Sequence, residues 1–297
     1  MTWHQLWLYI YFSFLRGMIK WFLHKVTGVC ELQRICSKYN VGAKRTKKIE
    51  SCLKHSHTAA VKKALTNGER VDEAVANIMA IKGIHQDEDP QFGPYLTACL
   101  TQIHGYKNLL AEVEVTRKTP YNSENQEHEN MLMQLWELLM PNNKLQSRIT
   151  KQWSDIGFQG DDPKTDFRGM GMLGLNNLLF FSSQFNAEAK QTLSHSHHPK
   201  FGYSFAIVGI NITNMAYTLM LNGTLRVHFY NLKQDMPNMT DFHRVYCYLL
   251  FEFDKFWLQS KPKDVMEFSR LRDKFQKKIT KILKDNCVIL EGEFFKE

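Results

Sequence analysis

The spacing of hydrophobic residues along this chain of 297 residues predicts a largely helical protein. Between residues 69 and 83 the apolar positions recur every three or four residues, as they do on one helix face: Val71, Val75, Ile78 and Met79. Gly83 then supplies a stop signal. A longer helical pattern covers residues 95–118, and Thr119-Pro120 ends it. The region before residue 120 is therefore expected to be helical.

The same kind of pattern continues to the end of the chain. Ser123 and Gln126 have the spacing of a capping box, which predicts the start of a helix that Pro141 closes. Residues 173–185 indicate another helix. Residues 203–221 have helical spacing over their whole length, although the apolar run at their start would also suit a buried strand. Two aromatic-rich stripes follow, which we interpret as core packing rather than a cofactor site: Phe242, Tyr246, Leu249, Phe253, Phe256 and Trp257, then Phe268, Leu271, Phe275, Ile279 and Ile282. The predicted fold class is all-α, an irregular multi-helix bundle.

The N-terminal segment raises the question of membrane association. Residues 3–23 are mostly apolar and aromatic, but they lack the basic start and the cleavage site of a secretory signal. A membrane-spanning helix would have nearly the right length, yet Arg16 and Lys20 would each cost about 2.5–3.5 kcal/mol near its centre. As an amphipathic helix, the segment gathers one polar stripe: Ser13, Arg16, Lys20 and His24. The predicted membrane-contacting residues lie mostly away from this stripe: Trp7, Ile10, Phe14, Met18 and Trp21.

We therefore favour an N-terminal amphipathic, membrane-associated helix that lies in the interface. The basic residues that follow would add attraction to anionic lipid: Lys44, Arg45, Lys47 and Lys48. One alternative is that the helix packs on the protein's own domain. A mitochondrial presequence is another, although the aromatic content argues against it.

Charge and patterning suggest three parts. Residues 1–60 would form the N-terminal apolar and basic helix with a linker around residues 38–51, residues 61–120 a helical extension, and residues 121–290 the main domain. Residues 1–70 hold thirteen Lys or Arg and three acids, whereas the rest of the chain holds 25 basic and 27 acidic residues. The net charge of +8 is thus N-terminal, and with no nucleic-acid-binding motif present, no nucleic-acid partner is expected.

Several common chemistries lack their motifs. The six cysteines include no C-x-x-C pair, which argues against a zinc ribbon and for reduced thiols in a cytosol-facing protein. The P-loop, the nucleophile elbow and H-E-x-x-H are also absent. His195, His197 and His198 cluster before Pro199 without an acidic or cysteine partner nearby in sequence. We interpret these histidines as a solvated loop rather than a metal site.

The candidate chemistry lies in residues 153–175. Gly169-x-Gly171-x-x-Gly174 matches the glycine fingerprint of dinucleotide-binding enzymes, but that fingerprint follows a buried strand. Here the preceding residues are polar, rich in turns and interrupted by Pro163, and no second strand is indicated downstream. Nicotinamide or flavin binding is therefore the disfavoured alternative.

One arginine in this segment, Arg168, stands close to three carboxylates: Asp161, Asp162 and Asp166. In a structural interpretation, Arg168 bridges Asp161 or Asp162, while Thr165 or Asp166 caps the helix that begins near Gly169. In a functional interpretation, the loop presents Arg168 outwards, its glycines let another protein's surface approach, and the helix N-terminus favours a phosphate. Residue chemistry alone leaves both interpretations open.

The same segment resembles the signature of the ELMO (engulfment and cell motility) domain. The matching residues are Trp153, Gly157-Phe-Gln-Gly160, Asp162-Pro163, Thr165-Asp-Phe-Arg-Gly169 and Gly171-x-Leu-Gly-Leu175. Residues 198–213 resemble the continuation of that family, and CELQRIC at residues 30–36 points to its short, single-domain ELMOD branch. The resemblance spans nearly the whole chain.

This resemblance implies a GTPase-activating protein for small GTPases of the Arf and Arl families, a regulator of another enzyme rather than an enzyme itself. Arg168 would be the catalytic arginine, supplied in trans, whereas the larger engulfment-type ELMO proteins lack this arginine and act with Dock-type exchange factors. The expected loop-supporting residues are Gln159, Asp161, Asp162, Thr165, Asp166, Gly169 and Gly171. The alternative function is a non-catalytic scaffold that binds a small GTPase or an exchange factor.

The resemblance also sets expectations about cofactors and location. GTP and Mg²⁺ would belong to the partner GTPase, so the chain itself is expected to hold no cofactor and no metal. Its expected location is the cytosol and the cytoplasmic face of an intracellular membrane, of the endoplasmic reticulum, lipid droplets or mitochondria. Roles in antiviral defence and lipid-droplet traffic are associated with the family.

Overall fold

The computed structural model describes residues 3, 15–66, 68–232 and 236–295. None of these residues forms a β-strand, so the predicted all-α fold class is confirmed. The chain divides into two compact units, which we call the N-terminal unit (Met1–Gly105 with Tyr230–Met236) and the main unit (Tyr106–Phe229 with Pro237–Glu297). The domain limits expected at residues 60 and 120 stay predictions.

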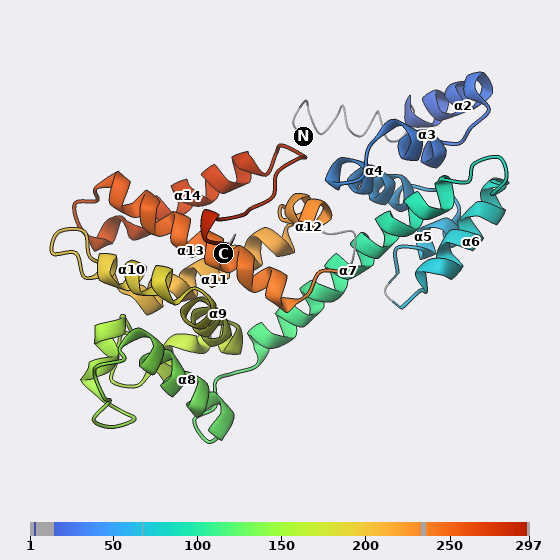
Figure 1. The fold of residues 1–297 in the computed structure, drawn as a ribbon. Coiled ribbons are helices and arrows are strands. Elements are labelled where there is room, and N and C mark those ends of the chain that lie inside the picture. Colours follow the sequence, from blue (N-terminus) through green and yellow to red (C-terminus); the bar gives the residue numbers. More distant parts are fainter. Residues whose placement is uncertain (1–2, 4–14, 67, 233–235, 296–297) are drawn as a thin grey trace. The chain divides into compact units, whose positions relative to one another are not determined.

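The N-terminal unit consists of short helices. They are α2 (Arg16–Thr27), α3 (Glu31–Lys38), α4 (Ala43–Lys54), α5 (Ala59–Lys63), α6 (Val71–Lys82) and the first part of α7 (Phe92–Lys118) (Figure 1). Helix α3 packs against α4, and α5 packs against α6. Gly83 follows α6 in the left-handed conformation, so the predicted stop is confirmed.

The basic segment expected to be a linker is instead largely helical. Helix α4 occupies most of it and buries Ile49 and Leu53. Arg45 is also buried, at 2% exposure, and its guanidinium lies 4.5 Å from the ring centroid of Tyr95. The expectation that Arg45 attracts anionic lipid is therefore wrong, because its charge points into the unit.

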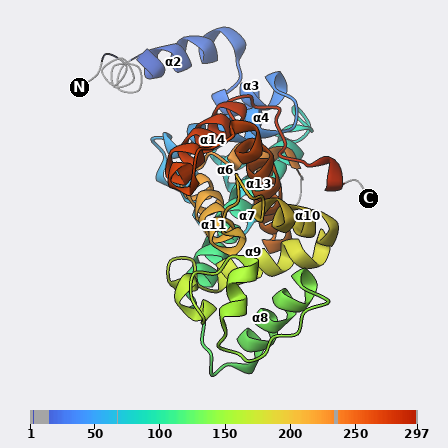
Figure 2. The same ribbon diagram turned by 90° about the vertical axis from the view of Figure 1, so that its left-hand side faces the viewer.

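The main unit is built around helix α9. Its elements are the second part of α7, α8 (Gln126–Leu139), η2 (Lys151–Ile156), η3 (Pro163–Arg168), α9 (Gly171–Gln184), α10 (Asn186–Ser196), α11 (Phe205–Leu221), most of α12 (Arg226–Leu232), α13 (Met239–Ser260), η4 (Val265–Glu267), α14 (Phe268–Ile282) and η5 (Glu293–Phe295). Helix α9 contacts α8, α10, α11, α13 and η3, and both views show it among the helices of this unit (Figures 1 and 2). A helix surrounded in this way needs apolar side chains on most of its faces, as α9 has.

The C-terminal part of the first aromatic stripe packs against the second stripe where α13 and α14 meet. Phe253 and Trp257 of α13 are fully buried, and the ring of Phe253 lies 5.4 Å from that of Phe275 in α14. Residues 205–221 are helical throughout, so the strand alternative for the start of α11 is wrong. The interpretation of both stripes as core packing agrees with this burial.

The predicted capping box before α8 is wrong by two residues. Asn125, rather than Ser123, is the N-cap, and its side chain accepts the backbone N–H of Glu127 at 2.9 Å. Among the described residues no single helix is both long and apolar enough to cross a membrane, although the bent pair α11 and α12 meets that criterion by length and composition.

Candidate functional site

The Arg168 loop, which we define as residues 157–170, connects η2 to α9 and contains η3. Asp162 begins η3, since its Oδ1 accepts the backbone N–H of Lys164 at 3.0 Å, and Pro163 supplies a φ angle suited to the first helical position. Arg168 is the last residue of η3. The cap at Asp162 therefore fixes the short helix from which the arginine extends.

Buried aromatic rings hold the same loop from the inside. Phe167, next to Arg168, is buried, and its ring centroid lies 5.4 Å from Tyr121 and 5.6 Å from Phe158. Trp153 continues this cluster at 5.8 Å from Phe158. A 3₁₀ helix has three residues per turn, so neighbouring side chains diverge by about 120°. With Phe167 directed into the core, the side chain of Arg168 is directed towards solvent.

Arg168 is exposed, and it forms no hydrogen bond or ion pair with the described residues. The bridge to Asp161 or Asp162 that the structural interpretation required does not occur in the structure. The side chain of Asp166 forms a hydrogen bond within the loop instead: its Oδ2 accepts the backbone N–H of Gln159 at 2.9 Å. Burial raises the pKa of Asp166 above its ordinary value, although this hydrogen bond and the charge of Arg168 favour the ionised form.

A second arginine, Arg148, holds the loop through a cluster of polar side chains. Its guanidinium contacts both carboxylate oxygens of Glu129, Oδ1 of Asp162 at 3.0 Å and the hydroxyl of Tyr121 at 3.4 Å. We call these four residues the Arg148 cluster. Burial and the hydrogen bond to Glu129 raise the pKa of Tyr121, so its hydroxyl stays protonated and can donate. Asp162 thus serves both as the cap of η3 and as a partner of Arg148.

Sequence reasoning missed Arg148, Glu129 and Tyr121. The contacts of Arg148 reach partners that are 14, 19 and 27 positions away. No helical or strand periodicity links residues at such separations, so the pattern of the chain held no signal for this cluster.

The remaining predicted loop residues lie at the surface. Asp161 is exposed, and only its backbone oxygen is engaged, by the N–H of Thr150 at 2.9 Å. Thr165 is exposed and its hydroxyl lies 3.4 Å from the backbone oxygen of Asp162. The side chain of Gln159 is also exposed, and its contribution to the loop is its backbone N–H.

The two glycines differ in their surroundings. Gly169 is exposed, and a Cβ added there would meet no atom within 4 Å. Gly171 is buried with φ +52°, and an added Cβ would overlap the carbonyl oxygens of Arg117 and Thr119 at the end of α7. The close approach at Gly171 is therefore internal to the main unit. Gly169, rather than Gly171, is therefore the glycine whose missing side chain leaves open space at the surface beside Arg168.

The expected cap of α9 by Thr165 or Asp166 is wrong. Met170 is the N-cap of α9, and it forms no side-chain capping hydrogen bond. The N–H of Met172 instead donates to the carbonyl of Thr119 at 2.8 Å. One donor of the first turn of α9 is thus satisfied by the end of α7.

The histidine cluster is more ordered than expected. His195 lies on α10, and its Nδ1 is 2.6 Å from Oδ2 of Asp254. Tyr203 donates to the other carboxylate oxygen of Asp254, also at 2.6 Å. Burial raises the pKa of Asp254, although both hydrogen bonds favour the carboxylate. The solvated-loop interpretation is therefore wrong for His195. No group of three His, Cys, Asp or Glu suited to a metal occurs among the residues that the structure describes.

The predicted membrane-contacting residues are described in part. Met18 and Trp21 lie on α2 with exposed fractions of 69% and 66%. The remaining three lie outside the described residues: Trp7, Ile10 and Phe14. Lys20 forms an ion pair with Glu31 of α3, so one polar side of α2 is directed towards its own unit.

Comparisons with known proteins agree with the resemblance of the loop. Residues 111–272 match the ELMO/CED-12 family model. ELMO domain-containing protein 2 of Homo sapiens is 51% identical over 287 residues, which cover 96% of this chain and 98% of that protein. ELMO domain-containing protein 1 of Mus musculus is 48% identical over 308 residues, covering 98% and 94%. ELMO domain-containing protein B of Dictyostelium discoideum is 36% identical over 274 residues, covering 90% and 94%.

No solved structure gives a significant match. The family match covers η2, the Arg168 loop and α9, and the similar proteins align far beyond it on the N-terminal side. This chain therefore belongs to the ELMO/CED-12 family, in the branch of the ELMO domain-containing proteins 1 and 2.

Proposed function

We propose that this protein is a GTPase-activating protein for small GTPases of the Arf and Arl families, and that Arg168 is the catalytic arginine that it supplies in trans. The observation that carries the proposal is the arginine itself. It is exposed and unpaired among the described residues, yet it extends from a short helix capped by Asp162 and anchored by Phe167. A side chain that stabilised only its own fold would be expected to contact a neighbouring acid.

The chemistry of GTP hydrolysis needs such a group. A small GTPase already binds the nucleotide and Mg²⁺, so the activating protein needs no cofactor of its own. Negative charge develops on the phosphoryl group in transfer, and an arginine inserted from a partner accelerates hydrolysis by about 10³–10⁵ in known cases. The planar guanidinium can contact two phosphate oxygens at once, whereas a lysine ammonium offers a single point charge.

The pre-organised loop reduces the entropic cost of inserting Arg168. The cap by Asp162, the turn closed by Asp166 and the buried ring of Phe167 fix the backbone before any partner binds. Binding then has to order little more than the arginine side chain. The absence of a side chain at Gly169 leaves room for the partner's switch regions beside it.

Single-turnover GTP hydrolysis on a panel of Arf and Arl GTPases tests this proposal. Wild-type protein is expected to accelerate hydrolysis by orders of magnitude on at least one member, and Arg168→Lys is expected to bind that member without accelerating hydrolysis. Lys164→Gln, which removes another exposed cation of the same loop, serves as the matched control and is expected to retain activity. If Arg168→Lys and wild type accelerate hydrolysis equally, Arg168 is not the catalytic arginine. If neither accelerates hydrolysis while both bind, the protein is a scaffold.

We further propose that α2 attaches the protein to a membrane surface. Four large apolar side chains of this helix are exposed by 60% or more: Met18, Trp21, Phe22 and Val26. Such a face is suited to the interface of a bilayer. The cytoplasmic faces of the endoplasmic reticulum, lipid droplets and mitochondria are the membranes to examine, together with the cytosol. Antiviral defence and lipid-droplet traffic stay expectations of the family resemblance.

Flotation with liposomes tests this attachment. Wild-type protein is expected to float with vesicles, and a Trp21→Gln/Phe22→Gln variant is expected to stay in the soluble fraction. Equal behaviour of the two proteins would argue against attachment through α2.

A further inference from the structure

Three lysines of the N-terminal unit converge on one tyrosine. The ammonium groups of Lys38, Lys44 and Lys48 lie 5.8, 5.2 and 5.0 Å from the ring centroid of Tyr39. All three lysines are exposed, and none forms an ion pair with an acid among the described residues. We call these four residues the lysine cluster. Three positive charges around one ring repel one another, so the cluster is suited to an anionic ligand that neutralises them.

The ionisation of Tyr39 reflects this concentration of charge. Desolvation raises the pKa of Tyr39, but the hydrogen bond from Lys48 and the charges of Lys38 and Lys44 together outweigh it, so the pKa is lowered. The local potential therefore favours negative charge at this position.

Three members of the lysine cluster line a hollow of about 440 Å³ between α2, α3 and α4, whereas Lys44 approaches the ring of Tyr39 without being part of this lining. Lys38, Tyr39 and Lys48 line its polar side, whereas Ile19, Leu23 and Ile35 line its apolar side. The volume lies within the range of small-ligand pockets. An occupant that suits this lining combines several negative charges with an apolar part.

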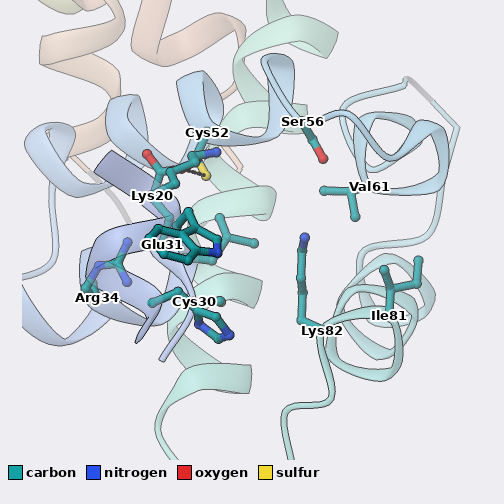
Figure 3. Close-up of a pocket in the computed structure, with 12 residues that line it drawn as sticks. Lys20, Cys30, Glu31, Arg34, Cys52, Ser56, Val61, Ile81 and Lys82 are labelled. Carbon is teal, nitrogen blue, oxygen red and sulfur yellow. Dashed lines mark hydrogen bonds and ion pairs between the residues drawn. The ribbon is translucent and has the colours of Figure 1, made fainter. Parts of the chain in front are cut away.

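Glu31, an acidic residue in the lining of this hollow, already has partners within the N-terminal unit. Glu31 lines the hollow but pairs with Lys20, and it also accepts from Cys52 at 3.2 Å. A neighbouring hollow of about 360 Å³ lies beside the same Lys20–Glu31 pair, with Lys82 and Val61 among its lining residues (Figure 3). That second hollow does not include the lysine cluster, so it offers less convergent positive charge.

Helix α2 connects the first hollow to the exposed apolar face. Ile19 and Leu23 form part of the lining, while Met18, Trp21 and Phe22 of the same helix are exposed. If the exposed face lies in a bilayer interface, α2 also brings the lining of the hollow close to the lipid headgroups. An anionic lipid then suits both parts of the lining. Its phosphates contact the lysines, and its glycerol and acyl region packs against the apolar residues.

We propose that this hollow binds the headgroup of a polyphosphorylated inositol lipid in the membrane to which α2 attaches. The inference rests on the proposed membrane attachment and adds lipid selectivity to it. The ammonium groups of Lys38 and Lys48 in the lining, with that of Lys44 beside Tyr39, match several phosphates on one ring better than the single net charge of phosphatidylserine. Each lysine close to an anionic surface also strengthens attachment.

Vesicle sedimentation with the full-length protein tests this site. Phosphatidylcholine vesicles carry either phosphatidylserine or phosphatidylinositol bisphosphate at equal total charge, so that general electrostatic attraction is matched. Wild-type protein is expected to partition about tenfold more strongly onto the phosphoinositide vesicles. The variant Lys38→Gln/Lys44→Gln/Lys48→Gln is expected to lose that preference. The control variant Lys277→Gln/Lys281→Gln/Lys284→Gln removes three exposed lysines in and after α14 and is expected to keep it.

The outcomes separate this site from the proposed function. Soluble inositol phosphate should compete with the vesicles if the headgroup itself is recognised, and equal binding of wild type to both anionic vesicles would overturn the site while preserving membrane attachment. Loss of the preference in the α14 control as well would also overturn it, since net charge would then explain the effect. An absence of binding to any vesicle would reject the site and the attachment together. GTPase activation in solution, measured in parallel, tests Arg168 separately from both.

Discussion

Arg148 contacts the Arg168 loop through Asp162, whereas Arg168 belongs to the loop, and the two arginines differ in their burial and in their partners. Arg148 is partly buried and contacts Glu129, Asp162 and Tyr121, so its charge is neutralised within the fold. Arg168 is exposed and has no hydrogen-bond or ion-pair partner among the described residues. The comparison indicates that Arg148 stabilises the loop, whereas Arg168 stays available to a partner protein. Variants at the two positions should therefore have separable effects.

The largest expected effect follows replacement of the exposed arginine. Arg168→Ala should lower the activated rate of GTP hydrolysis by about 10³, because the cation that stabilises the transition state is lost. The free energy of unfolding should change by less than about 0.5 kcal/mol, since the side chain is exposed and forms no hydrogen bond or ion pair with the described residues. Urea unfolding and single-turnover hydrolysis measure the two quantities, and a large loss of stability would contradict the exposed position.

The next effect tests how the start of α9 packs against the end of α7. Gly171→Ala should destabilise the protein by about 3 kcal/mol, because alanine disfavours φ +52° and its Cβ would overlap the carbonyl oxygens of Arg117 and Thr119. Gly169→Ala is the matched control at a position with open space, and it should be nearly neutral in urea unfolding. Similar costs at the two glycines would show that the start of α9 does not pack closely against Arg117 and Thr119.

A smaller stability loss is expected at the partly buried arginine. Arg148→Met should cost about 2 kcal/mol in urea unfolding, since Glu129 and Asp162 lose their common partner. It should also reduce GTPase activation by about tenfold, because the capped start of η3 is no longer held. Arg148→Lys should recover part of both losses. Full activity in Arg148→Met would show that the cap and the aromatic rings alone position Arg168.

The smallest effect concerns pH and the core of the main unit rather than the loop. Burial lowers the pKa of His228 to about 4, whereas an unfolded histidine titrates near 6.5. The unfolded state therefore binds a proton first as the pH falls, and stability should decrease between pH 6.5 and pH 4. The contribution of His228 to the loss from pH 7 to pH 5 should be roughly 1–2 kcal/mol. His228→Asn, which can still accept the N–H of Leu290, should reduce the pH dependence of urea unfolding by that amount, while His243, whose pKa burial also lowers to about 4, should maintain the rest.

The fold could be predicted from the sequence where apolar spacing alone determines an element. The five positions of the stripe from Phe268 to Ile282 all lie on α14, which buries Leu271, Phe275 and Ile279, and Gly83 ends α6 as expected. The prediction failed where a single side chain decides between neighbouring options. Asn125 caps α8 in place of Ser123, because local hydrogen-bond geometry selects among several suitable residues. The buried Arg45 made α4 resemble a solvated basic linker.

The site could be predicted only in part. The density of glycine, aspartate and arginine located the loop, and the family resemblance singled out Arg168. The direction of the Arg168 side chain depends on the burial of Phe167 and on the contact of Asp162 with Arg148. Both depend on residues far apart in the sequence, so no local pattern predicts them. The same limit applies to His195, whose acidic partner Asp254 lies 59 positions away.

The most direct test of the central claim is complex formation with a transition-state analogue. A responsive Arf or Arl GTPase loaded with GDP and Mg²⁺ is mixed with the protein in the presence and absence of aluminium fluoride, which mimics the phosphoryl group in transfer, and binding is measured by calorimetry. An arginine that acts on the transition state predicts tight binding that requires aluminium fluoride in the wild type and is lost in Arg168→Lys. Equal binding by the two proteins, with or without aluminium fluoride, would contradict it.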